Sequence, residues 1–92
     1  MRKIIDTPRF KREYKAFVRN NSNLEKRIRE TIRLMKEDVF SPSLHTHKLE
    51  GKLYGLRACS CGYDCRIAFA MRNVDGEEVI ALYSIGTHDQ VY

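Results

Sequence analysis

Two of the three histidines of this 92-residue sequence lie in its second half and the third, His45, lies just before it, all near runs of residues that are typical of strands. His47 and Lys48 precede one such run, and Arg66 stands among apolar neighbours inside the next. His88 and Tyr92 follow the last run. In antiparallel strands the start of one lies beside the end of its neighbour. We therefore expect these side chains to converge on one face of a sheet.

Metal-free cleavage of RNA requires side chains of these types. An imidazole base removes the proton of the ribose 2′-hydroxyl, and an imidazolium acid protonates the leaving 5′-oxygen. Cations stabilise the charge that builds on the phosphorane-like transition state. Structural alternatives remain, because His45 suits a loop, His47 suits a hydrogen bond to a turn and Tyr92 suits an anchor for the C-terminus. Arg66 is harder to explain structurally, since its neighbours are apolar.

The positive charge of the chain is concentrated in the first half. The net charge is +5, but residues 9–36 carry ten basic and three acidic side chains, a net charge of +7. From residue 39 onward the net charge is −1. Such asymmetry indicates a polyanionic partner, either a nucleic acid or an acidic protein. A solvated helix face is the alternative.

The three cysteines lie within the short stretch CSCGYDC, from Cys59 to Cys65. An odd number of cysteines does not form a complete disulfide framework, so we expect small reduced thiols in a sheet. Zinc bound by Cys59, Cys61, Cys65 and a histidine is the alternative, although the spacing differs from the usual pairs of zinc ligands.

The first half of the sequence predicts a short strand and two helices. A short apolar piece at residues 3–6 precedes Thr7 and Pro8, and apolar residues then recur at helical spacing to Arg19. Ser22 and Glu25 predict a capping box at the start of a second helix. That helix is expected to end at Ser41 and Pro42. Its buried stripe is predicted to comprise Leu24, Ile28, Ile32, Met35 and Val39.

The second half predicts three short strands, at residues 53–61, 65–72 and 78–85. Asp75 and Gly76 favour a tight hairpin turn between the last two strands. Strand alternation places Ile67, Phe69 and Met71 on the face that packs against the helices. The chain length indicates one domain, residues 1–92. Without an apolar run of about 20 residues or a signal peptide, we expect a cytoplasmic protein with no membrane contact.

Three stretches together resemble the RelE/YafQ family of toxins from type II toxin–antitoxin systems. They are HKLEGKLYGLRA, GYDCRIAFA and LYSIGTHDQVY. The resemblance implies an α+β fold in the order β-α-α-β-β-β, with a small, mainly antiparallel sheet and a two-helix hairpin packed on one face. It also implies a metal-independent endoribonuclease that cleaves mRNA, typically on the ribosome, needs no cofactor and is neutralised by a cognate acidic antitoxin.

The resemblance also implies roles for individual residues. Through it, His47, Asp64, His88 and Tyr92 match active-site positions of the family, and Arg66 matches a phosphate-contacting arginine. We expect His88 and His47 to act as acid and base and Tyr92 to stack on a base of the RNA. Cations that would bind RNA or its phosphates are expected at Lys48, Lys52 and Arg57.

Two positions depart from the YafQ pattern. Ser60 replaces a catalytic histidine and Ser84 replaces an arginine, which suggests either a weaker nuclease or a charge role taken over by Arg66 and Arg57. Two alternative functions therefore stay open. One is a ParE-like toxin that inhibits gyrase and cleaves nothing, and the other is a catalytically weak RNA-binding homologue.

Overall fold

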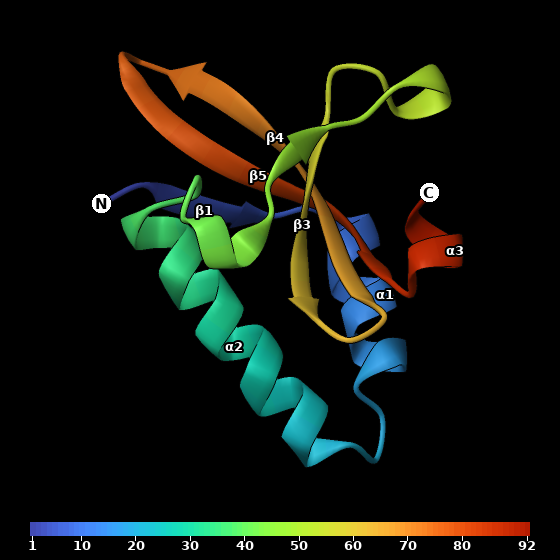
Figure 1. Ribbon diagram of the computed structural model, residues 1–92. Coiled ribbons are helices and arrows are strands. Elements are labelled where there is room, and N and C mark those ends of the chain that lie inside the picture. Colours follow the sequence, from blue (N-terminus) through green and yellow to red (C-terminus); the bar gives the residue numbers. More distant parts are fainter.

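A five-stranded sheet forms the centre of the structure, a computed structural model that describes residues 1–92 (Figure 1). The strand order is β1-β5-β4-β3-β2, and all neighbours are antiparallel except the parallel pair β1 and β5. The strands are β1 (Lys3–Asp6), β2 (His47–Lys48), β3 (Arg57–Gly62), β4 (Cys65–Val74) and β5 (Glu77–Gly86). The predicted α+β class with a mainly antiparallel sheet is confirmed.

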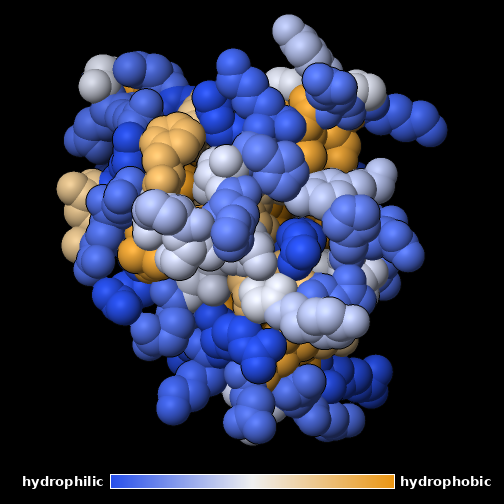
Figure 2. Space-filling model, in the orientation of Figure 1, coloured by the Kyte–Doolittle hydropathy of each residue, from blue (hydrophilic) through white to orange (hydrophobic).

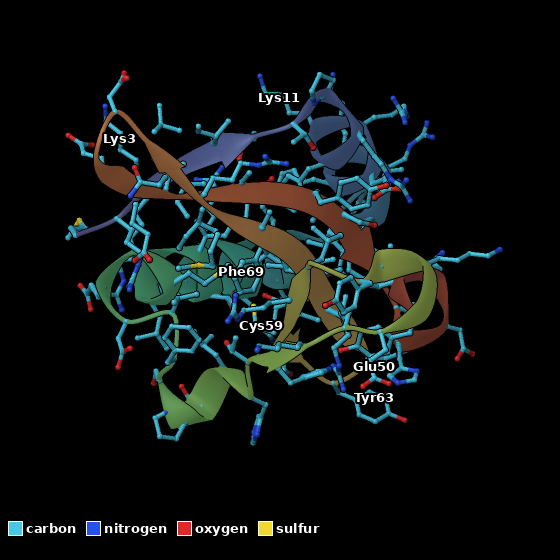
Figure 3. All side chains as sticks on the ribbon, turned by 90° about the horizontal axis from the view of Figure 1, so that it is seen from above. Lys3, Lys11, Glu50, Cys59, Tyr63 and Phe69 are labelled. Carbon is cyan, nitrogen blue, oxygen red and sulfur yellow. A yellow bond between two sulfur atoms is a disulfide. The ribbon has the colours of Figure 1, made fainter.

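Two helices, α1 (Pro8–Phe17) and α2 (Ser22–Glu37), bury their apolar sides against one face of the sheet. Phe10 of α1 and Ile28 and Met35 of α2 join one core cluster with Ile67 and Phe69 of β4. In the view from above, Phe69 and Cys59 lie near the centre of the molecule while labelled charged residues lie at its edge (Figure 3). Of the apolar stripe predicted for the second helix, Ile28, Met35 and Val39 are buried, although Val39 lies beyond the end of the helix. Leu24 and Ile32 are partly buried against the same cluster.

The opposite face of the sheet carries a smaller apolar cluster of Leu49, Ala58, Ala68 and Val91. Val91 belongs to α3 (His88–Val91), a single helical turn that follows β5 directly. Thr87 caps this turn, because its hydroxyl accepts a hydrogen bond from the Gln90 backbone N–H while the Gln90 side chain accepts one from the Thr87 N–H. The packing of Val91 and this double cap together fix α3 beside the sheet.

The hairpin of β4 and β5 has the turn that the sequence predicts. Asp75 and Gly76 both have positive φ, 52° and 82°, as a two-residue turn between right-twisted strands requires. The Asn73 side chain accepts a hydrogen bond from the Gly76 N–H at 3.0 Å.

The helix boundaries differ from the prediction at two points. The expected capping box of Ser22 and Glu25 is absent, because Asn21 is the cap and its side chain accepts the Leu24 N–H at 3.1 Å. Asparagine caps a helix as well as serine does. The helix also ends at Glu37, before the expected stop at residues 41–42, and Pro42 instead begins a short 3₁₀ turn, η1 (Pro42–Leu44).

The strand expected to start at residue 53 starts at Arg57 instead. Residues Gly51–Leu53 form a 3₁₀ turn, η2, and Gly51 and Gly55 have positive φ, so this segment is not extended. The two-residue strand β2 was not predicted, and it pairs His47 with Ala58. This pairing determines where His47 points.

The surface over the sheet edge and α2 is mostly hydrophilic in the orientation of Figure 1 (Figure 2). No helix in the structure combines the length and the apolar character needed to span a membrane.

Candidate functional site

A cavity of about 440 Å³ lies where β2, β3, β4 and α3 meet. Its walls are formed almost entirely by polar side chains, which come from positions distant in the sequence. The lining residues are His45, His47, Ser60, Arg66, His88 and Tyr92. The fold thus brings together four of the five residues predicted to carry the chemistry, His47, Arg66, His88 and Tyr92.

His47 is held in one tautomer by the backbone before it. Its Nδ1 lies 3.0 Å from the carbonyl oxygen of His45, and a carbonyl only accepts, so Nδ1 carries the hydrogen. His45 has the left-handed φ of 52° that turns this carbonyl toward the ring. In the neutral imidazole the lone pair is therefore on Nε2, where it accepts the Tyr92 hydroxyl at 3.2 Å. Proton acceptance by His47 is directed into the cavity.

Tyr92 contacts both imidazoles. Its ring centroid is 4.4 Å from that of His88 and 5.8 Å from that of His47, and both pairs are edge-on. Burial raises the pKa of the Tyr92 phenol, although the positive charge of Arg66 opposes this effect. The phenol therefore stays protonated near neutral pH and donates to His47.

His88 is positioned through its backbone. Its N–H donates to the Asp64 carboxylate at 2.9 Å, and Asp64 itself sits in the turn between β3 and β4 with a left-handed φ of 50°. The His88 side chain is 56% exposed, and its Nδ1 lies 3.5 Å from the Asp89 carboxylate. Asp64, one of the predicted site residues, thus does not line the cavity but fixes the start of α3.

Arg66 supplies the positive charge of the cavity. Its Nη1 donates to the carbonyl oxygens of Gly62 at 3.0 Å and Cys65 at 2.8 Å, and Ser60 Oγ lies at 3.4 Å. No carboxylate forms an ion pair with Arg66. The guanidinium group is therefore oriented by neutral acceptors and keeps its full charge for an anionic ligand.

The three predicted cations Lys48, Lys52 and Arg57 do not reach this cavity. Side chains alternate along a strand, so Lys48 turns away from the cavity that His47 enters. Lys48 and Arg57 line a separate hollow of about 320 Å³, and the Arg57 guanidinium lies 5.6 Å from the ring centroid of Phe40. Lys52 is exposed on η2. Arg66 is the one predicted cation in the cavity.

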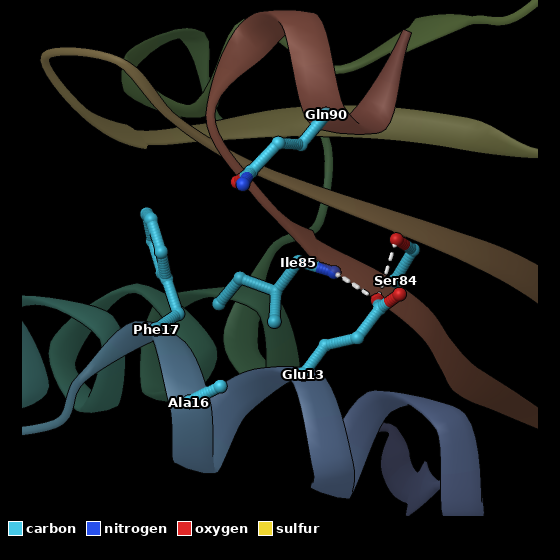
Figure 4. A pocket seen from close by; sticks show the side chains of 6 residues that line it. All are labelled: Glu13, Ala16, Phe17, Ser84, Ile85 and Gln90. Carbon is cyan, nitrogen blue, oxygen red and sulfur yellow. Dashed lines mark hydrogen bonds between the residues drawn. The ribbon is translucent and has the colours of Figure 1, made fainter.

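The two serines that depart from the family pattern lie in different places. Ser60 lines the cavity beside Arg66. Ser84 is only 4% exposed. Its hydroxyl donates to the Glu13 carboxylate of α1 at 2.7 Å, in a pocket between α1 and the end of β5 that Figure 4 shows. The Ile85 N–H donates to the same carboxylate at 3.2 Å (Figure 4). Ser84 thus joins α1 to the end of β5.

Replacing Glu13 with glutamine should lower the free energy of unfolding at pH 7 by about 1 kcal/mol, because the charged acceptor is lost. Burial alone would raise the pKa of Glu13, but the hydrogen bonds from Ser84 and Ile85 and the charge of Arg9 lower it from its ordinary value of 4.5. The carboxylate therefore stabilises the fold fully above that value, and its contribution disappears as the pH falls through the lowered pKa.

Denaturant unfolding of both proteins at several pH values checks this prediction. The difference in the free energy of unfolding between the wild-type protein and Glu13→Gln should vanish at acid pH. Glu30→Gln is the matched control, since Glu30 is paired with Arg33 on the exposed side of α2. This substitution should change the free energy of unfolding by only ~0.3 kcal/mol. Equal effects of the two substitutions would contradict the role of Glu13.

The expectation of three reduced thiols was wrong, because Cys61 and Cys65 form a disulfide across the turn between β3 and β4. Cysteines that flank a tight turn of two antiparallel strands come within disulfide reach, here with 5.0 Å between the Cα atoms. Cys59 is free and buried, and burial raises the pKa of its thiol to about 12. Two of the proposed zinc ligands are thus bonded to each other, and no group of three or more metal-ligating side chains is assembled.

Sequence reasoning missed the contribution of His45, which it treated as a loop residue. The sequence carried no clear signal for it, because the contact depends on the left-handed backbone of His45 between η1 and β2. The positions of Ser60 and Ser84 had no signal either. They depend on how the strands and α1 pack.

Residues 2–92 match the family model described as the bacterial toxin YafQ of a type II toxin–antitoxin system. No curated protein sequence matches the chain. Among solved structures, YafQ from E. coli strain BL21(DE3) is 14% identical with a TM-score of 0.77, covering 100% of this chain and 99% of that one. The YoeB/ParE toxin from Agrobacterium tumefaciens is 17% identical with a TM-score of 0.76, covering 94% and 98%. The E. coli DinJ-YafQ toxin-antitoxin complex matches at 15% identity and a TM-score of 0.74, covering 99% and 97%.

Proposed function

Because the chain belongs to the YafQ family of bacterial toxins from type II toxin–antitoxin systems, we propose that it is an endoribonuclease that cleaves mRNA. One observation carries the proposal. The imidazoles of His47 and His88 and an arginine without a carboxylate partner line a single cavity, and the Tyr92 ring lies against both of these imidazoles. A protein that only binds a partner needs no such pair of proton carriers beside a free cation.

The proposed reaction is attack of a ribose 2′-oxygen on the adjoining phosphorus. His47 is the base, because its Nε2 lone pair faces the cavity and its Nδ1–H stays bonded to the His45 carbonyl when the ring becomes positively charged. His88 is the acid, and the Asp89 carboxylate is placed to accept its Nδ1–H. The P–O5′ bond breaks as His88 protonates the leaving oxygen. The products are a 2′,3′-cyclic phosphate and a 5′-hydroxyl.

Arg66 stabilises the extra negative charge of the phosphorane in this scheme. Its Nη1 is taken up by the Gly62 and Cys65 carbonyls, so its remaining N–H groups are available to the phosphate. A guanidinium group aimed in advance at the developing charge lowers the barrier without having to reorganise.

The partners follow from the charge of the helices and from the relatives. We propose that an acidic antitoxin covers the free toxin, as DinJ accompanies YafQ in the E. coli complex. The net charge of +7 over residues 9–36 suits such a segment. The same charge suits ribosomal RNA when the antitoxin is absent, and we propose that cleavage takes place on the ribosome.

Induction of the wild-type protein in a bacterial host, followed by mapping of mRNA 5′ ends, tests this function. Growth arrest with cuts at codon-related positions, both lost in Arg66→Ala, is the expected result. Co-expression of a cognate antitoxin should restore growth. Arrest without cuts that persists in Arg66→Ala would indicate a gyrase-inhibiting toxin instead. Harmless expression with intact transcripts would indicate an RNA-binding homologue that has lost activity.

Tyr92→Phe should lower the rate of cleavage about fivefold, because the hydrogen bond that orients His47 Nε2 is lost. Tyr92→Ala should cost much more, since the ring that contacts both imidazoles is removed as well. Single-turnover cleavage measures both changes. Tyr54→Phe, at a side chain 85% exposed and outside the cavity, should leave the rate unchanged. Equal losses in the two Tyr92 variants would contradict a packing role for the ring.

A further inference from the structure

A second cavity adjoins the one that holds the proposed chemistry. It has a volume of about 420 Å³ and lies between α2, η1 and β3. His45 and Ser60 line both cavities, so the two share a boundary at these residues. We call the second cavity the α2–β3 groove. No part of the proposed cleavage step uses it.

Arg27 of α2 reaches across this groove to the sheet. A Cβ atom added to Gly62 would lie 2.6 Å from Arg27 Cδ and 2.9 Å from its Nη1, so the arginine lies directly on the backbone of Gly62. Gly62 has a φ of +129°, which side chains other than hydrogen rarely allow. Glycine at this position therefore permits the close approach of Arg27.

Gly62 also links Arg27 to the cavity chemistry. Its carbonyl oxygen accepts the Arg66 Nη1–H at 3.0 Å, while the Arg27 side chain lies where its Cβ would be. Two guanidinium groups thus contact one residue, Arg66 from the first cavity and Arg27 from the α2–β3 groove. Neighbouring cationic side chains are what a protein uses to follow the phosphate backbone of a single RNA strand.

The charge of Arg27 is available to a ligand. Arg33 also lines the groove, but Glu30 and Glu37 pair with it at 3.2 and 3.1 Å. Arg27 forms no ion pair in the structure. Its side chain is exposed, lies against Gly62 and is not neutralised by a carboxylate, so the guanidinium group is accessible to a phosphate.

We propose that the α2–β3 groove binds the nucleotide next to the scissile phosphate, with Arg27 contacting the phosphate of that nucleotide. The inference rests on the proposed function, because it assigns a neighbouring subsite on the same RNA strand. A substrate that spans only the scissile bond does not reach Arg27. A longer strand does.

Binding of two RNA oligonucleotides, a dinucleotide and a pentanucleotide, tests the subsite. Both carry 2′-O-methyl groups, which prevent attack by the 2′-oxygen, and NMR titration measures even weak binding. Arg27→Ala should weaken binding of the pentanucleotide about tenfold, as expected for loss of one charge-assisted contact. It should also reduce the salt dependence, the slope of log K against log salt, by about 0.7. Dinucleotide binding should not change.

Lys26→Ala is the matched control. Lys26 is the neighbouring residue on the same helix, is exposed and lines neither cavity. Its substitution therefore removes one positive charge, as Arg27→Ala does, but outside the groove. It should leave both affinities within twofold. Equal effects of Arg27→Ala and Lys26→Ala on the pentanucleotide would overturn the subsite, as would an equal loss of dinucleotide binding in Arg27→Ala. Failure of the wild-type protein to bind the pentanucleotide would overturn the subsite, while the proposed function is tested separately by mapping mRNA 5′ ends.

Discussion

Replacing Arg66 with lysine is expected to reduce RNA cleavage by about 10² to 10³, nearly as much as replacing it with alanine. The reason is that different N–H groups of the guanidinium group bind different partners. Nη1 donates to the carbonyls of Gly62 and Cys65, and the other N–H groups remain for phosphate. A lysine offers a single nitrogen, which those carbonyls would compete for, and it cannot present a planar fork to the phosphate.

Single-turnover cleavage by wild type, Arg66→Lys and Arg66→Ala measures this effect. Thermal unfolding of each variant separates a loss of catalysis from a loss of fold. Arg57→Ala is the control, since Arg57 lies over Phe40 outside the cavity and its loss should change the rate less than threefold. Full activity in Arg66→Lys would show that charge alone is needed and would contradict the orienting role of the carbonyls.

Removing the imidazole of His47 or of His88 should lower the rate of cleavage by about 10² to 10⁴. His47 must be neutral to accept a proton and His88 must be protonated to donate one, so the wild-type rate should follow a bell-shaped curve in pH. His47→Ala should lose the acidic limb of this curve, and His88→Ala should lose the basic limb. Rates measured across the pH range for all three proteins test both assignments.

His45→Ala is the control for the two histidine variants. The hydrogen bond between His45 and the His47 ring uses the backbone carbonyl of His45, and this carbonyl remains when the side chain is removed. The His45 variant should therefore keep both limbs and retain its rate within about tenfold. If it were as impaired as His47→Ala, the imidazole of His45 would have a direct role. If His47→Ala lost the basic limb, the acid and the base would be exchanged.

The periodic parts of the fold could be predicted from the sequence because local patterns determine them. Ile28 and Met35 of the predicted stripe are buried as expected, and Asp75 and Gly76 form the expected turn. The helix cap moved by one residue because Asn21 and Ser22 are both good caps and only the entering backbone decides between them. The extra strand β2 depends on pairing with β3, which no local pattern reveals.

The candidate site could be predicted in part. His47, Arg66, His88 and Tyr92 meet because antiparallel neighbours bring the start and end of strands together. Lys48 was placed on the same face as His47, although strand alternation turns it away. Asp64 was expected in the cavity, and it instead accepts the His88 N–H from outside it. These outcomes depend on where short strands begin, which is the least certain part of any sequence interpretation.

The cysteines and Arg27 show a second limit of sequence reasoning. The spacing of Cys61 and Cys65 indicates a disulfide only when a turn is known to separate them. Arg27 was one of ten basic residues in a charged segment, and nothing in the sequence distinguished it from Lys26. Its contact with Gly62 depends on how α2 crosses β3, and tertiary packing alone determines that crossing.

The chemical ends of the RNA products test the central claim most directly, namely that His47, His88 and Arg66 catalyse attack by the 2′-oxygen without a metal. Wild-type protein would be incubated with ribosomes that carry an mRNA. A second mRNA would contain one 2′-deoxynucleotide at the cleaved position. We predict fragments ending in a 2′,3′-cyclic phosphate and a 5′-hydroxyl, with the deoxy-substituted site left intact. Fragments with a 5′-phosphate, or cleavage at the deoxy-substituted site, would contradict the account.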